Sequence, residues 1–126
     1  MNHNYQELVE QYITAYNKFD VAGMMHNLHN DIYFENVSNG ETTVTLQGTE
    51  EFRQQAEQAK SFFRSREQKI TDLQIDGDTV TVAIDYTGVL NINLPNGMNA
   101  GDTMALKGKS TFVFQDNKII RIKDES

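Results

Sequence analysis

The spacing of hydrophobic residues changes once along the chain, from a helical period to the alternation of strands. From Tyr5 to Phe19 the apolar residues recur at i, i+3, i+4 and i+7, which predicts an amphipathic helix. Asp20 is suited to cap a second, short helix, and Thr49 is suited to cap a third. The predicted buried face of the third helix consists of Phe52, Ala56, Ala59 and Phe63.

Between and after these helices the hydrophobic residues alternate with polar ones. Two short strands, residues 31–37 and 42–46, flank the turn Asn39-Gly40. Further strands are predicted over residues 70–75, with one slip that indicates a bulge, and over 80–87, 104–114 and 119–123. Segregated helices and antiparallel strands predict an α+β fold in one domain, residues 1–126, with the helices on the concave side of one curved sheet.

Composition and charge restrict the class of partner. The 126 residues can bury about two thirds of their unfolded surface, and the net charge of −7 argues against nucleic acid as a partner. The absence of cysteine excludes disulfides, a thiolate nucleophile and a cysteine zinc site. No apolar run could span a membrane, and the first residues lack the basic start and apolar stretch of a signal peptide, so we expect a cytoplasmic protein that binds no membrane.

Several runs of residues resemble the NTF2-like superfamily. They are Tyr12-Ile-Thr-Ala-Tyr-Asn-Lys-Phe-Asp20, Asp31-Ile-Tyr-Phe-Glu-Asn36, Leu46-Gln-Gly-Thr-Glu-Glu-Phe52, Asp85-Tyr-Thr-Gly88 and Gly108-Lys-Ser-Thr-Phe-Val-Phe114. Within that superfamily the chain is most similar to SnoaL-like (polyketide cyclase-like) and ketosteroid isomerase-like proteins. The resemblance covers nearly the whole chain. It implies a cone of three helices and a strongly bent, mainly antiparallel sheet around an apolar pocket, commonly assembled as a homodimer through the sheet, and it bears on architecture more than on chemistry.

The resemblance also implies roles for single residues. Tyr12 stands where the isomerases have their oxyanion-stabilising tyrosine, with Tyr16 one helical turn further on. Asn36 stands where they have the aspartate that shuttles the proton, and Ser110 where they have a protonated aspartic acid. Because an asparagine cannot accept a proton at neutral pH, the resemblance implies a pocket with neutral polar groups and no base at that position.

A pocket of this kind would bind a small apolar or aromatic molecule through aromatic walls and a few polar groups. The residues expected to line it are Tyr12, Tyr16, Phe34, Asn36, Tyr86, Met104, Ser110 and Phe112. No glycine-rich phosphate loop, nucleophile elbow or HExxH motif occurs, so no cofactor and no metal are expected.

Three hypotheses of function remain open. The first is a small-molecule-binding domain. The second is a cyclase or isomerase in which a less expected residue, His26, Asp85 or Glu35, acts as the base. The third is a dimerisation or interaction module whose cone is filled by its own side chains. The alternation of its strand predicts that Glu35 lies outside the pocket. His26 and His29 have a spacing that could hold a metal, but the end of a surface helix is the better interpretation of both residues.

Overall fold

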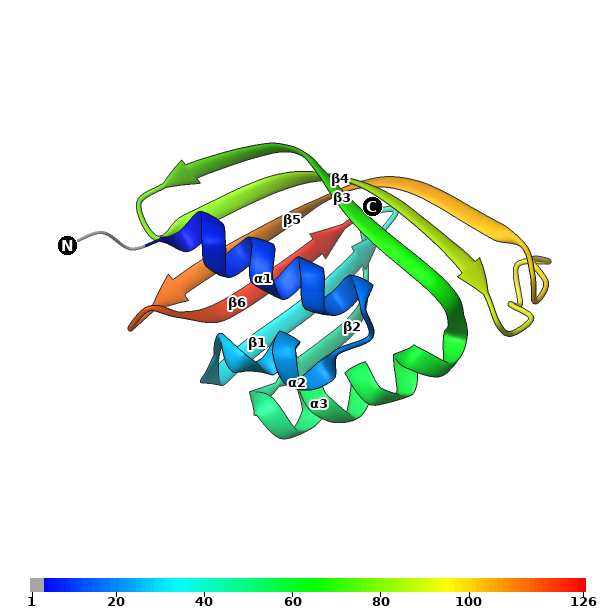
Figure 1. The fold of residues 1–126 in the computed structure, drawn as a ribbon, viewed down its shortest axis with the longest axis horizontal. Coiled ribbons are helices and arrows are strands. Elements are labelled where there is room, and N and C mark those ends of the chain that lie inside the picture. Colours follow the sequence, from blue (N-terminus) through cyan, green and yellow to red (C-terminus); the bar gives the residue numbers. More distant parts are fainter. Residues whose placement is uncertain (1–3) are drawn as a thin grey trace.

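Three α-helices cover one face of a six-stranded, strongly curved sheet, as Figure 1 shows for residues 4–126, the part of the chain that the computed structural model describes. The helices are α1 (Tyr5–Asn17), α2 (Val21–His26) and α3 (Gly48–Ala59), and a short 3-10 helix, η1 (Lys60–Phe62), follows α3. The strands are β1 (Leu28–Ser38), β2 (Glu41–Gln47), β3 (Phe63–Asp76), β4 (Thr79–Leu90), β5 (Thr103–Gln115) and β6 (Lys118–Glu125). The part of the signal-peptide prediction that concerns Met1 to His3 lies outside the described residues.

The sheet has the order β2-β1-β6-β5-β4-β3. All neighbouring strands are antiparallel except β1 and β6, which are parallel. The chain therefore places its last described strand in the interior of the sheet, between β1 and β5. The predicted α+β fold, a mainly antiparallel curved sheet with three helices, is confirmed.

The first helix forms where the hydrophobic spacing predicts it. Asn4 caps α1, since its side-chain oxygen accepts a hydrogen bond from the backbone N–H of Glu7 at 3.1 Å. The buried face of α1 includes Val9, Tyr12 and Ile13, which pack on the concave side of the sheet with β3 and β4. As predicted, Asp20 caps α2, through a hydrogen bond from the backbone N–H of Gly23 at 3.0 Å.

The inner faces of β4 and β5 make the other half of the core. Val80, Val82 and Ile84 are buried on β4, and Phe112 and Phe114 are buried on β5, in the alternation read from the sequence. The ring of Phe114 stacks on that of Tyr5 at a centroid distance of 4.1 Å, which joins the start of α1 to the sheet. The predicted bulge is also present, as a register shift of β3 between Ile70 and Asp72.

Several strands are longer than the sequence predicts, and both ends of α3 differ from the prediction. Gln47 rather than Thr49 occupies the cap of α3, and its backbone N–H donates to the carboxylate of Glu51 at 2.9 Å. Phe63 does not belong to the buried face of α3, because the helix ends at Ala59 and Phe63 begins β3. The extended backbone at Phe63 brings its ring back toward the sheet, where it lies 6.1 Å from that of Tyr86.

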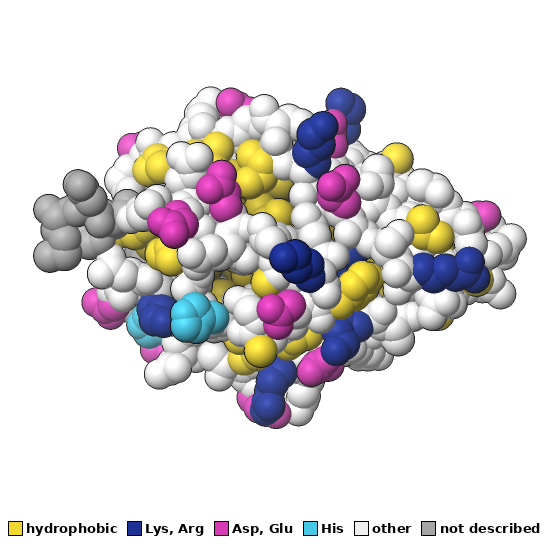
Figure 2. Space-filling view, viewed as in Figure 1, with side chains coloured by type: hydrophobic (Ala, Val, Ile, Leu, Met, Phe, Trp, Pro, Cys, Tyr) yellow, Lys and Arg dark blue, Asp and Glu magenta, His cyan; other side chains and the backbone are white. Residues whose placement is uncertain are grey.

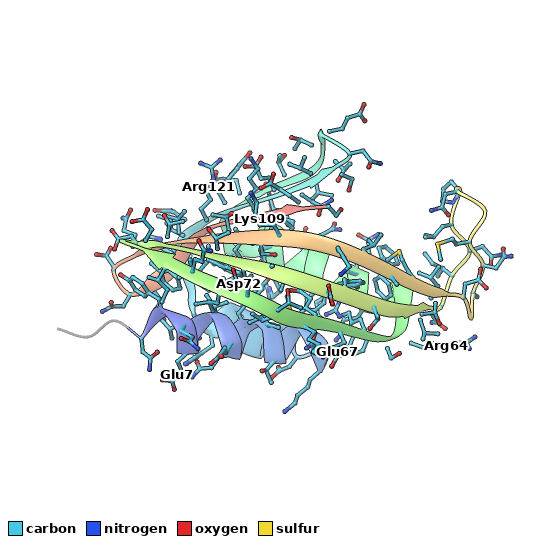
Figure 3. The ribbon with its side chains drawn as sticks, turned by 90° about the horizontal axis from the view of Figure 1, so that it is seen from above. Glu7, Arg64, Glu67, Asp72, Lys109 and Arg121 are labelled. Carbon is cyan, nitrogen blue, oxygen red and sulfur yellow. The ribbon has the colours of Figure 1, made fainter. Side chains whose placement is uncertain are left out.

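Charged side chains are spread over the surface. Figure 2 shows Lys and Arg interspersed with Asp and Glu on the face covered by α1, without a basic stripe of the kind that binds nucleic acid. Figure 3 shows Lys109 and Arg121 on the side of the sheet away from α1. No helix within residues 4–126 is long and apolar enough to cross a membrane.

Candidate functional site

The curvature of the sheet leaves two adjoining cavities on its concave side. The larger, about 340 Å³, lies against β4, β5 and β6, and we call it the sheet chamber. The smaller, about 210 Å³, lies between α1, α3 and β1, and we call it the helix chamber. Tyr16, Asn36, Phe63 and Asp124 line both chambers, so these four residues mark where the two meet. A cone packed solid by its own side chains, the third hypothesis, does not describe this interior.

At the wall of the sheet chamber two tyrosines form a pair. The hydroxyls of Tyr16 and Tyr86 are hydrogen-bonded at 2.9 Å, and their rings meet edge to face at 6.2 Å. Tyr12, one turn before Tyr16, lines the helix chamber and is almost fully buried. The helical spacing thus sends the two phenols of α1 toward one continuous space, as the sequence predicts.

Opposite the tyrosines, three neighbouring strands bring three polar side chains together. Asp124 of β6 is paired in register with Ser110 of β5 on one side and with Asn36 of β1 on the other. The hydroxyl of Ser110 donates to Oδ1 of Asp124 at 2.7 Å. The amide of Asn36 turns instead to β2 and donates to the hydroxyl of Thr43 at 2.8 Å. Ser110 and Asn36 therefore flank a carboxyl group that the sequence-based description of the pocket did not contain.

Burial sets the protonation of these groups. It raises the pKa of Asp124 to about 6, against the lowering effect of the hydrogen bond from Ser110. Burial also raises the pKa of Tyr12 well above its usual value, with a further increase from the charge of Asp124. The pKa values of Tyr16 and Tyr86 are raised as well, mainly by burial. The phenols are hence hydrogen-bond donors at neutral pH, while the carboxyl of Asp124 titrates close to it.

A cation also reaches the helix chamber. Arg66 of β3 is only 6% exposed, and its Nε donates to the backbone oxygen of Tyr16 at 2.9 Å. Its guanidinium lies over the ring of Tyr16, 3.7 Å from the centroid, and 4.5 Å from the centroid of Phe19. The expectation that the polar groups of the pocket are all neutral is therefore wrong, because Asp124 and Arg66 both line it.

Seven of the eight residues expected to line a pocket do lie at the walls of the chambers. Tyr12 and Phe34 line the helix chamber, and Tyr16 and Asn36 line both chambers. Tyr86, Met104 and Ser110 line the sheet chamber. Phe112 is the exception: it is 1% exposed and packs edge-on against the ring of Tyr12 at 5.6 Å, so it supports the wall from behind.

The bases considered from the sequence lie away from the chambers. The carboxylate of Glu35 accepts a hydrogen bond from Arg121 at 2.9 Å on the outer side of the sheet, as its alternation predicts. Asp85 is about half exposed and lies 3.6 Å from the ammonium of Lys107. His26 is an exposed residue at the end of α2. Within residues 4–126 no group of three or more His, Asp or Glu side chains could hold a metal ion.

The sequence does indicate that the side chain of Asp124 points inward, although the strand predicted from it stops before this residue. Asp124 lies two residues after the buried Ile122, so the alternation that points Ile122 inward points Asp124 inward too. The strand predicted from the sequence ends at Lys123, two residues before the end of β6, and so does not include Asp124. Arg66 has no comparable signal, since it lies among polar residues at the start of β3.

The two chambers have an acidic group on one wall and hydrogen-bond donors on the other. On one wall the carboxyl group of Asp124, which is ionised above about pH 6, is flanked by Ser110 and Asn36. Across from it stand neutral phenols that can donate to an oxygen atom. A general base facing hydrogen-bond donors is the arrangement that removes a proton next to a carbonyl and stabilises the oxyanion formed.

Comparison with known proteins places the fold. The chain resembles a structure described as a putative polyketide cyclase from Xanthomonas campestris pv. campestris, with a TM-score of 0.82, 20% identity, and coverage of 96% of this chain and 88% of the other. It also resembles a protein with a ketosteroid isomerase-like fold from Catenulispora acidiphila in complex with trimethylamine (TM-score 0.76, 17% identity, coverage 94% and 83%). A third is an LEH-like epoxide hydrolase of M. tuberculosis (TM-score 0.75, 17% identity, coverage 94% and 79%).

No curated protein matches the sequence. A family model, described as the SnoaL-like domain, matches residues 9–122, from the interior of α1 to the interior of β6. The chain therefore belongs to the SnoaL-like domain family and has the NTF2-like fold that its sequence predicts.

Proposed function

We propose that the two chambers form one binding site for a small, mainly apolar molecule, and that Asp124 removes a proton from it. The observation that carries this proposal is the carboxyl of Asp124, placed where the chambers meet and hydrogen-bonded to Ser110. Tyr12 and Tyr16 are the residues that would stabilise the resulting oxyanion. The proposal retains the cyclase or isomerase hypothesis but replaces its candidate bases with Asp124.

The raised pKa of Asp124 supports this role. A carboxylate with a pKa of about 6 is ionised at neutral pH, yet it binds a proton more strongly than an ordinary aspartate does. The chambers together offer space of the order found in small-molecule sites, with walls that are mainly aromatic and aliphatic. Similar folds described as a putative polyketide cyclase and as an epoxide hydrolase agree with a reactive pocket, without indicating the substrate here.

Proton exchange tests the proposal directly. Small ketones with exchangeable hydrogens would be incubated with the protein in heavy water, and deuterium uptake at the carbon next to the carbonyl would be followed by NMR. We expect catalysed exchange that Asp124→Asn reduces by roughly a hundredfold or more, the usual contribution of a general base. Asp85→Asn is the matched control, because it removes an exposed carboxylate from the same sheet.

A pocket that only binds is the alternative outcome of the same experiment. Ketones that raise the melting temperature of the protein but show no exchange above the buffer rate would refute the role of Asp124 as a base. Exchange that persists unchanged in Asp124→Asn would refute it as well. The binding site itself would survive both results.

We also propose that the chain forms a homodimer through the outer face of the sheet and acts in the cytoplasm. The outer face of β4 and β5 carries short uncharged side chains that are only partly exposed: Thr81, Ala83, Thr111 and Val113. A surface of short uncharged side chains can pack on a second copy. Light scattering during gel filtration tests this: a dimer that Thr111→Arg converts to a monomer supports the proposal, and a wild-type monomer refutes it. Fractionation of the source cells tests the compartment.

A further inference from the structure

Arg66 is the one described residue with a buried side-chain nitrogen atom that has no hydrogen-bond partner. Its Nη2 is inaccessible to solvent and unpaired, although the residue lines the helix chamber. An arginine carries a positive charge in proteins, and a buried charge ordinarily has a counter-ion. None of the ion pairs among residues 4–126 includes Arg66. Its charge is thus left without an anionic partner.

The contacts that Arg66 does make hold it in place but leave most of its donors free. The bond from Nε to the backbone of Tyr16 uses one of five N–H groups. The rings of Tyr16 and Phe19 stack against the guanidinium and accept no conventional hydrogen bond from it. These contacts fix the plane of the guanidinium. A fixed plane with unused donors is how arginine recognises a carboxylate, through two parallel hydrogen bonds.

We propose that Arg66 binds the carboxylate of an apolar or aromatic carboxylic acid held in the helix chamber. This inference rests on the proposed small-molecule site and names the class of ligand that the site takes. The other walls of the chamber are suited to the apolar part of such a molecule, because they consist largely of hydrophobic side chains: Met24, Phe34, Val44, Leu46 and Phe52.

The position of Asp124 determines which end of the ligand lies at Arg66. Two carboxylates repel each other, so the acid group of the ligand would bind at Arg66 and its uncharged part would extend to the junction of the two chambers. Tyr16 and Phe63, which line both chambers, flank this path. The carbon that loses a proton to Asp124 would then lie in the part of the ligand remote from its carboxylate.

Matched pairs of ligands test the inference on the unmodified protein. Phenylacetate, cinnamate and 4-phenylbutyrate would each be compared with the corresponding primary amide by isothermal titration at pH 7.5. The amides keep the size and the apolar part but remove the charge. We expect the acids to bind roughly tenfold more tightly, the difference that a charge-assisted hydrogen bond makes. Equal binding of acids and amides, tighter binding of the amides, or no binding by any of them would overturn the inference.

Variants of Arg66 then test whether this residue causes the preference for acids over amides. Arg66→Met keeps the apolar stem and removes the charge, so it should abolish the preference for acids, while Arg66→Lys should retain part of it. Arg64→Met is the matched control, because Arg64 is exposed on the same strand and lines neither chamber. A preference that survives in Arg66→Met would overturn the inference. Proton exchange on neutral ketones is assigned to Asp124, Tyr12 and Tyr16 and does not depend on a preference for acids, so the two proposals can fail separately.

Discussion

Replacing Asp124 with asparagine should make the protein more stable at neutral pH. The side chains have nearly the same shape, and the Ser110 hydroxyl can still donate to Oδ1, as it does at 2.7 Å in the wild type. What the substitution removes is a charge that burial disfavours. If Asp124 is retained for its chemistry, the fold tolerates an unfavourable group at the site, and removing it should stabilise the folded state.

The size of the effect follows from the shift in pKa. The value rises from 3.8 to about 6 on folding, which is about two pH units and corresponds to roughly 3 kcal/mol at most. Between these two values the folded state holds a proton that the unfolded state has lost, so stability falls as the pH rises from about 4 to about 6. Above pH 6 the whole penalty is present. Below pH 4 it is absent, and the variant and the wild type should be equally stable at this site.

Thermal and urea denaturation at a series of pH values measure this directly. At pH 7.5 we expect Asp124→Asn to raise the free energy of unfolding by about 1–3 kcal/mol, or the melting temperature by about 4–10 °C. The gain should shrink toward zero as the pH falls to about 4. Asp85→Asn should change stability by less than about 0.5 kcal/mol at either pH, since Asp85 is exposed. A variant less stable than the wild type at pH 7.5, or a gain that does not depend on pH, would refute the reasoning.

Three further substitutions examine the walls of the chambers. Ser110→Ala removes the hydrogen bond that lowers the pKa of Asp124, so an NMR titration of the carboxyl should give a midpoint above that of the wild type; an unchanged midpoint would contradict the assignment. Gly108→Ala would place a Cβ 2.6 Å from the backbone oxygen of Glu125, so the end of β6 must move, and we expect a loss of about 1–3 kcal/mol in urea denaturation together with weakened proton exchange. A stable, fully active variant would show that this strand end adapts freely. Tyr86→Phe removes the hydrogen bond between the two tyrosine hydroxyls and should lower stability by about 0.5–1.5 kcal/mol, and a neutral effect would indicate that water replaces the bond.

The sequence predicts the walls of the site better than its reactive group. Tyr12 and Tyr16 are found by helical spacing, and Met104 and Ser110 by the alternation of one strand, since both patterns report which side of an element faces inward. Phe112 follows the same alternation but lies behind Tyr12, because alternation gives the face of a strand and not the depth below the cavity.

The two charged groups of the site depend on information that local patterns lack. The strand containing Asp124 is held by pairing with β1, which lies about ninety residues earlier in the chain. That pairing extends the strand through a stretch whose own residues, Lys-Asp-Glu-Ser, are typical of a solvated end. Arg66 is buried because the rings of Tyr16 on α1 and Phe19 in the turn after α1 cover it. Neither contact can be read from neighbouring residues in the sequence.

The interior position of β6 has a consequence for how the chain folds. β1 and β2 on one side of the sheet, and β3, β4 and β5 on the other, are joined only through this strand (Figure 1). A ribosome makes β6 after the other five, so until it emerges both part-sheets expose an unpaired edge, which is the kind of surface that promotes association between chains. The same late segment brings in Asp124. The protein should consequently acquire its completed sheet and its ionisable pocket in the same step, and a nascent chain stopped before Lys118 should have neither.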